Sequence, residues 1–238
     1  MNPVLQQWLL NLAIDFPVNL GVLPSVVDGD DSQSGGLNVR SLPGFSLDDV
    51  IVRLVELAEA GLVEFAYQPE NGDSRIVAPS ALRPIMIMHG GAEQDLSFTL
   101  TSSGAAAWEM VADPRWHELE DDTGAPVLEN GAIVGFNWTL CCQSAEHIMA
   151  ALGWWPMLHY GEHIDLGSIA WRLEEEREMK YWKSLKNIHV VTFRSFAGGP
   201  AMPAWPHGSR PEWFTQWWIS HSRWYRQPWE MEGWPPPR

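Results

Sequence analysis

The sequence predicts an α+β fold built from two domains, residues 1–115 and 125–238. Three observations support this prediction. Helical and strand-like hydrophobic patterns both occur in each part, which is typical of mixed folds. The 238-residue length is sufficient for one or two hydrophobic cores. Finally, the negative charge is concentrated in the first part, whereas the end of the chain is rich in tryptophan and proline.

The first domain begins with two predicted helices. Apolar residues recur at helical spacing over residues 2–14. Residues 28–44 are acidic and glycine-rich and predict a loop. Ser46 then has the features of a helix N-cap, and Asp49 three residues later completes a capping box. The helix that follows is expected to end at Gly61, because glycine is the usual residue just after a helix.

Two strands and a helix complete this domain. Residues 62–67 and 96–100 predict strands, and the hydroxyl of Thr101 is expected to cap a helix that runs through Trp108. The predicted elements of the second domain are a loop at 121–131, a strand at 132–140, a helix from Ser144 to Leu152, a charged helix at 168–181, a strand at 188–194 and a Trp- and Pro-rich strap from Gly198 onward.

Two short segments carry a resemblance to a known family. Residues 52–63 (VRLVELAEAGLV) resemble the third helix and first wing strand of winged helix-turn-helix domains. Residues 98–104 (FTLTSSG) resemble the step that closes the wing in several bacterial regulators of that family. The resemblance implies a winged-helix-like N-terminal domain, followed by a smaller α+β unit with a Trp/Pro-rich C-terminal strap.

In winged-helix proteins the equivalent helix enters the DNA major groove. Its polar residues here are Asp48, Asp49, Arg53, Glu56 and Glu59, four acids against one base. A protein that binds duplex DNA needs lysine or arginine to neutralise phosphates. DNA is therefore not the expected partner, and a winged-helix transcriptional regulator is the alternative rather than the leading hypothesis.

The charge distribution favours a basic protein as partner. Residues 1–125 hold 19 of the 30 acidic residues but only five of the 15 basic ones, so they carry −14 of the net charge of −15. Such a surface attracts cationic partners. The leading hypothesis is a non-enzymatic protein-binding module. A looser resemblance of residues 100–109 and 181–185 to uncharacterised bacterial immunity-type proteins implies a neutralising partner of a basic protein.

Tryptophan is the most unusual feature of the composition. The chain has 15, and seven of them lie in the last 34 residues. Tryptophan is enriched at the centres of protein interfaces, so Trp217, Trp218 and Trp224 join the candidate partner-binding residues. The alternative is that the strap lies across its own domain and places these rings in the core.

A second alternative is a zinc-dependent hydrolase. Residues 159–163 (HYGEH) match the pattern H-x-x-E-H, in which His159 and His163 would bind zinc and Glu162 would act as the base. This chemistry requires both imidazoles on one face of a helix. Pro156 and Gly161 lie in or beside the segment, which favours a loop instead.

The remaining features predict a cytoplasmic protein without a cofactor. The two cysteines, Cys141 and Cys142, are adjacent and are expected to be small buried residues rather than a disulfide or a zinc site. No apolar run of bilayer-spanning length occurs, so no membrane partner is expected. The first residues lack the basic start of a signal peptide. No phosphate-binding loop or nucleophile elbow occurs either.

Overall fold

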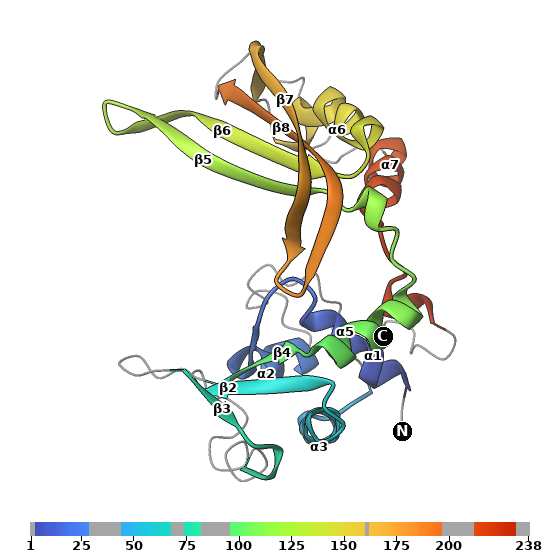
Figure 1. Cartoon of the computed structure of the whole chain (residues 1–238). Coiled ribbons are helices and arrows are strands. Elements are labelled where there is room, and N and C mark those ends of the chain that lie inside the picture. Colours follow the sequence, from blue (N-terminus) through green and yellow to red (C-terminus); the bar gives the residue numbers. More distant parts are fainter. Residues whose placement is uncertain are drawn as a thin grey trace. The chain divides into compact units, whose positions relative to one another are not determined.

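The computed structural model describes residues 3–28, 44–67, 74–81, 96–159, 162–196 and 212–231. It contains helices and two four-stranded antiparallel sheets, which confirms the α+β prediction (Figure 1). The chain divides into two compact units, each described separately below. Unit 1 comprises Met1–Asp113, Lys180–Trp182 and Arg226–Arg238, and unit 2 comprises Pro114–Met179 and Lys183–Tyr225.

Unit 1 contains a four-stranded sheet in the order β1-β4-β2-β3. Its elements are α1 (Pro3–Leu12), β1 (Val18–Asn19), η1 (Leu20–Val22), α2 (Leu23–Asp28), α3 (Leu47–Glu59), β2 (Val63–Tyr67), β3 (Arg75–Val77), β4 (Leu96–Leu100), α5 (Ser102–Ala112) and η5 (Pro228–Glu230). The three predicted helices and two predicted strands of this part are confirmed as α1, α3, α5, β2 and β4. Most of the predicted loop at 28–44 lies outside the described residues.

The hydroxyl caps explain where α3 and α5 begin. The backbone N–H of Asp49 donates to Ser46 Oγ at 3.2 Å, and the N–H of Ser46 donates to Asp49 Oδ2 at 2.8 Å. This reciprocal pair is the predicted capping box. At the second helix, the N–H of Gly104 donates to Thr101 Oγ1 at 3.1 Å. Each cap supplies an acceptor for an N–H group that the first helical turn leaves without a partner.

The core of unit 1 forms between the helices and the sheet. Helix α1 is buried around most of its circumference, and Trp8 and Leu9 are fully enclosed. Phe65 of β2 and Phe98 of β4 are cross-strand partners, and their ring centroids lie 5.8 Å apart. The indole N–H of Trp108 finds an acceptor in Asn11 Oδ1 at 3.3 Å. The core therefore satisfies the polar atom that this large ring carries inward.

Unit 1 also includes Tyr181 and Trp182, which lie far away in the sequence. The Tyr181 hydroxyl donates to the carbonyl of Ala13 at 2.7 Å and accepts from the N–H of Leu100 at 2.8 Å. The indole of Trp182 contacts that of Trp108 edge-on at 5.9 Å. The two segments of the looser sequence resemblance, around Leu100 and Tyr181, are therefore in direct contact.

Unit 2 contains a second sheet, in the order β5-β6-β8-β7. Its elements are η3 (Trp116–Glu118), β5 (Asp121–Glu129), β6 (Ala132–Cys142), α6 (Ala145–Leu158), β7 (His163–Lys180), β8 (Lys183–Phe196) and α7 (Glu212–Ser222), although Lys180 itself belongs to unit 1. The predicted strands at 132–140 and 188–194 are confirmed as parts of β6 and β8.

Helix α6 packs on one face of this sheet. Ile148, Ala151 and Trp155 of the helix pack with Leu140 and Val191 of the two central strands. Register explains the arrangement, since Leu140 and Val191 are directly paired and therefore project to the same side. The predicted burial of the cysteines is also confirmed, because both are free thiols enclosed by the fold.

The predicted charged helix at 168–181 is wrong, because these residues belong mainly to strand β7. The prediction followed the high helix propensity of the Glu, Leu, Arg and Lys residues in this segment. Such preferences amount to only a few tenths of a kcal/mol per residue. Here the chain reverses at Tyr181–Trp182 and continues in β8, whose β-branched residues favour a strand. Backbone pairing of β7 with β8 outweighs the local helical preference.

The predicted loop at 121–131 is also wrong, because residues 121–129 form strand β5. Strand β5 pairs with β6 along its whole length. The turn between them is Asn130-Gly131, with φ angles of 51° and 81°. Asn-Gly is the favoured pair for a two-residue hairpin with left-handed backbone at both positions. The hairpin signal was present in the sequence, but the acidic and glycine-containing run before it suggested a loop.

The helix capped by Ser144 continues beyond its predicted end at Leu152 and reaches Leu158, with Pro156 inside it. Burial of Trp155, 1% exposed, favours this extra turn. Within the predicted strap, the structure describes residues 212–231, which include α7 and η5. The other residues from Gly198 onward lie outside the described part of the chain. None of the described helices has both the length and the apolar character needed to cross a bilayer.

Candidate functional site

The predicted partner-binding residues of α3 do not all face outward. Asp48, Asp49, Glu56 and Glu59 are exposed, but Asp49 is occupied by the capping box. The hydrogen bonds from the side chain and backbone of Ser46 lower the pKa of the Asp49 carboxyl, so it stays ionised at the helix start. Asp49 is therefore a structural residue first, because its carboxylate stabilises the first turn.

The one cation of the predicted set is turned inward. Arg53 is only 7% exposed, and its Nη1 lies 2.6 Å from Glu56 Oε2. Apart from the capping residue Asp49, α3 therefore presents to solvent Asp48, Glu56 and Glu59, together with the exposed side chain of Val52. We call these four residues the acidic face of α3. Among the described residues, Asp48 and Glu59 form no ion pair.

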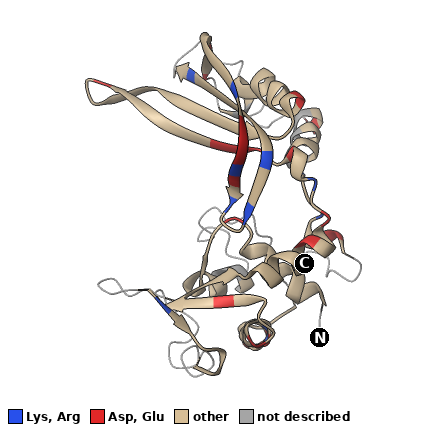
Figure 2. Ribbon diagram, in the orientation of Figure 1, with Lys and Arg blue, Asp and Glu red and all other residues tan. Residues whose placement is uncertain are grey.

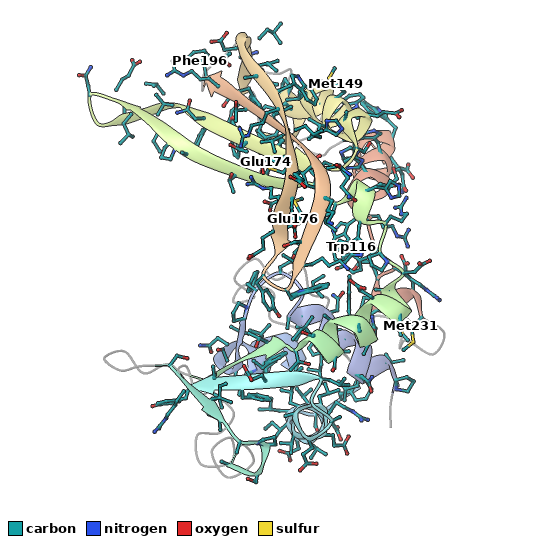
Figure 3. The ribbon with its side chains drawn as sticks, in the orientation of Figure 1. Trp116, Met149, Glu174, Glu176, Phe196 and Met231 are labelled. Carbon is teal, nitrogen blue, oxygen red and sulfur yellow. The ribbon has the colours of Figure 1, made fainter. Side chains whose placement is uncertain are left out.

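A second exposed acidic segment lies on β7. Glu174 accepts from Arg172 and Arg177, at 2.8 and 3.1 Å from their guanidinium nitrogens. These hydrogen bonds lower the pKa of the Glu174 carboxyl. Glu176 is exposed (Figure 3). The run of acids interrupted by one arginine is visible in the middle of β7 in Figure 2. The sequence analysis did not single out this segment, because it placed these residues on a helix.

Two of the three predicted tryptophan anchors pack against other aromatic rings of unit 2. Trp224 is 8% exposed and lies 5.0 Å from the ring of Trp116, which Figure 3 labels. Trp217 is half-buried and contacts Trp154 at 5.2 Å. These two rings therefore follow the alternative in which the strap contributes to its own domain. The side chain of Trp218 lies outside the described part of the structure.

The H-x-x-E-H residues do not share a helical face. His159 is the C-cap of α6 and stacks on Trp155 at 3.8 Å, whereas His163 begins β7. Glu162 accepts hydrogen bonds from Trp138 Nε1 at 3.1 Å and from Ser195 Oγ at 2.5 Å. The carboxylate thus accepts from one half-buried donor and one buried donor. The arrangement that the zinc hypothesis requires is not formed by these three residues.

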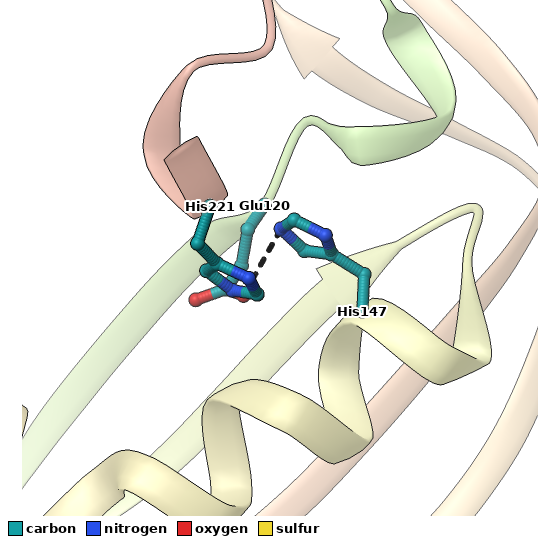
Figure 4. A group of neighbouring side chains, drawn as sticks. All are labelled: Glu120, His147 and His221. Atoms are coloured by element: carbon teal, nitrogen blue, oxygen red, sulfur yellow. Dashed lines mark hydrogen bonds and ion pairs between the residues drawn. The ribbon is translucent and has the colours of Figure 1, made fainter. Parts of the chain in front are cut away.

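A different cluster brings together three side chains that can bind a metal. Glu120 precedes β5, His147 lies in the first turn of α6, and His221 lies in the last turn of α7 (Figure 4). One donor atom from each residue lies within 4.8 Å of the other two. Oε2 of Glu120 is 3.4 Å from His221 Nε2 and 3.9 Å from His147 Nε2.

The surroundings of the cluster are tightly packed. The two imidazoles stack with centroids 3.6 Å apart and planes within 6°, and Trp217 stacks on the other side of His221 at 4.7 Å. Burial lowers the pKa of His147 to about 4, and the nearby charges of His221, Arg115 and His117 act in the same direction. His147 is therefore neutral at pH 7, with a lone pair on one ring nitrogen.

The sequence offered no signal for this cluster. Glu120, His147 and His221 are separated by 27 and 74 positions, so no motif spacing connects them. They meet because Ser144 caps α6 and thereby fixes His147 in its first turn, while α7 brings His221 from the far end of the chain.

Comparison of the chain with family models, curated proteins and solved structures found no match.

Proposed function

We propose that this protein is a non-enzymatic binding module that docks a basic protein through the acidic face of α3. The order of elements in unit 1 supports the idea of a winged-helix-like platform. Strand β4 lies between β1 and β2, and α3 immediately precedes β2. In winged-helix domains the helix in that position is the one that enters the DNA major groove.

The observation that carries the proposal is the inward position of Arg53. A helix that binds DNA must present cations to the phosphates. Here the only cation of α3 is buried and paired with Glu56, so the exposed residues are acidic or apolar. Acidic side chains around Val52 suit a surface that a lysine- or arginine-rich partner covers.

The narrower form of the proposal is an immunity-type role, in which the protein neutralises a basic partner. Its support is the −14 charge of residues 1–125, which favours rapid association with a cationic protein. A cytoplasmic location belongs to the same proposal. A winged-helix regulator remains the alternative function, supported by the strand order of unit 1.

Site-specific photocrosslinking tests the proposal. A benzoylphenylalanine at Val52 would lie among Asp48, Glu56 and Glu59, so crosslinking in the native host should capture a basic protein. Reversing Asp48 and Glu59 to lysine in the same chain should abolish that product. A chain that crosslinks to an acidic protein, or whose capture survives the reversal, contradicts the proposal.

The matched control is the same photoreactive residue at Met110. Met110 is 80% exposed and also lies in unit 1, on α5, so it reports contacts that any exposed position makes. The product expected from Val52 should be absent at Met110. An identical set of products at both positions would mean that α3 is not the docking surface.

A further inference from the structure

The cluster of Glu120, His147 and His221 has the composition of a transition-metal site. Two imidazoles and one carboxylate are a donor set that zinc takes in proteins, whereas calcium and magnesium prefer oxygen atoms alone. Three protein ligands leave one tetrahedral position for water or another ligand. The three residues come from different elements of unit 2, so an ion would connect α6 and α7 to the start of β5.

The two distances from Glu120 approach the spacing of ligand atoms around a small divalent ion. Two ligand atoms about 2.1 Å from a tetrahedral zinc lie about 3.4 Å from each other. The Glu120–His221 pair already has that separation, and the Glu120–His147 pair at 3.9 Å exceeds it by half an ångström. Rotation of the stacked imidazoles about their Cβ–Cγ bonds is the adjustment that would turn both lone pairs toward one point.

An unpartnered nitrogen supports the same conclusion independently. His147 Nε2 is fully enclosed and has no hydrogen-bond partner among the described residues, and the side chain is only 11% exposed. A buried polar atom without a partner is unfavourable and calls for an explanation. A metal ion bound at Nε2 supplies one, because it would occupy the lone pair of a neutral imidazole.

We propose that Glu120, His147 and His221 bind one divalent transition-metal ion of the zinc class. The ion is structural in this proposal, because it fixes α7 against α6 and β5. Trp217 stacks on the opposite face of the His221 ring. The site differs in every residue from the H-x-x-E-H segment that the sequence suggested, and it does not depend on the acidic face of α3.

Cobalt titration of the full-length chain, freed of metal by chelator, is the first test. Tetrahedral Co²⁺ bound to imidazole and carboxylate gives intense visible absorption, whereas Co²⁺ in water gives little. One equivalent of Co²⁺ should produce the bands, and one equivalent of Zn²⁺ should remove them. Absence of these bands in the wild-type chain overturns the proposal without any variant being needed.

Variants then assign the ligands. His147→Gln and His221→Gln should each weaken Zn²⁺ binding in calorimetry at least tenfold, and Glu120→Gln should do the same. His117→Gln is the matched control, because His117 is 65% exposed and lies near the cluster without being a member. Wild-type affinity in the three ligand variants, or equal loss in the control, overturns the assignment.

A thermal measurement distinguishes metal binding from simple packing of the two rings. An ion that binds only the folded chain raises its Tm. Zn²⁺ should raise the Tm of the wild type and of His117→Gln but not that of Glu120→Gln, measured against each chain in chelator. If Zn²⁺ leaves the wild-type Tm unchanged, the two histidines are only a stacked pair of rings.

Discussion

Gly104 lies directly against the carbonyl group of Leu62. A Cβ atom on Gly104 would be 1.8 Å from the Leu62 oxygen, closer than any side chain allows. The neighbouring Thr101 hydroxyl donates to the carbonyl of Gly61 at 2.6 Å, and the Thr101 N–H donates to Leu62 O at 3.1 Å. The two sequence segments that resemble winged-helix motifs are therefore joined at this point.

Replacing Gly104 with alanine should destabilise unit 1. The added methyl group forces α5 away from the residues that follow α3, and overpacking of this kind costs about 1–3 kcal/mol or more. Urea unfolding measures the change in the free energy of unfolding.

Gly153→Ala is the control, because a Cβ there meets nothing within 4 Å on helix α6. That substitution should instead stabilise by about 0.5–1 kcal/mol, because alanine is the better helix former. Equal effects at the two glycines would contradict the described contact.

Substitutions at Ser46 and at Glu59 should affect the free energy of unfolding differently, although both residues lie at the ends of α3. Ser46→Ala removes the side-chain acceptor for the Asp49 N–H and should cost about 1 kcal/mol in urea unfolding. Glu59→Lys should leave stability unchanged or slightly increase it, because a cation near the end of a helix interacts favourably with its dipole. A large loss of stability in Glu59→Lys would show that this carboxylate has a structural partner.

Stability should fall as the pH rises above about 9. Burial raises the pKa of both Cys141 and Cys142 to about 11, and burial raises that of Tyr181 to about 12. The unfolded chain therefore loses these protons at lower pH than the folded chain, so alkaline conditions favour unfolding. This contribution to stability is complete below about pH 8.5 and is lost progressively as the pH rises toward 11.

The measurement is the urea midpoint at several pH values between 8 and 11. A chain with both cysteines replaced by alanine should show a shallower decline than the wild type. The same burial predicts slow reaction of both thiols with a thiol reagent at pH 7 and rapid reaction after unfolding. Fast labelling of the folded chain would contradict the burial of the two cysteines.

Local signals predicted five elements of unit 1, namely α1, α3, α5, β2 and β4, but not β1, α2 or β3. Helices α3 and α5 begin at the hydroxyl caps Ser46 and Thr101, and β2 and β4 are short apolar runs, so neighbouring residues carry the information for these elements. Strand β7 shows where this fails. Residues 168–180 have good helix formers, and only pairing with β8 makes them a strand, which no local pattern reports.

The candidate sites, too, could be predicted only where their residues lie close together in the sequence. Spacing identified the acidic residues of α3, because they lie within one predicted helix, but it did not reveal that Arg53 is buried or that Asp49 is a cap. The cluster of Glu120, His147 and His221 could not be predicted, because its members meet only through the tertiary packing of α6 and α7. The H-x-x-E-H match does not correspond to a zinc site in the structure. Glu162 instead accepts hydrogen bonds from Trp138 and Ser195.

The proposed function requires that α3 attracts a cationic polypeptide rather than DNA. Fluorescence anisotropy at low salt can compare labelled duplex DNA with a labelled lysine-rich peptide. The wild type should bind the peptide and not the duplex. Reversing Asp48 and Glu59 to lysine should weaken peptide binding far more than the same reversal at Glu175 and Glu178 of β7, which changes the net charge equally. Binding to the duplex with a strong salt dependence, or equal weakening by the two reversals, would contradict the proposed function.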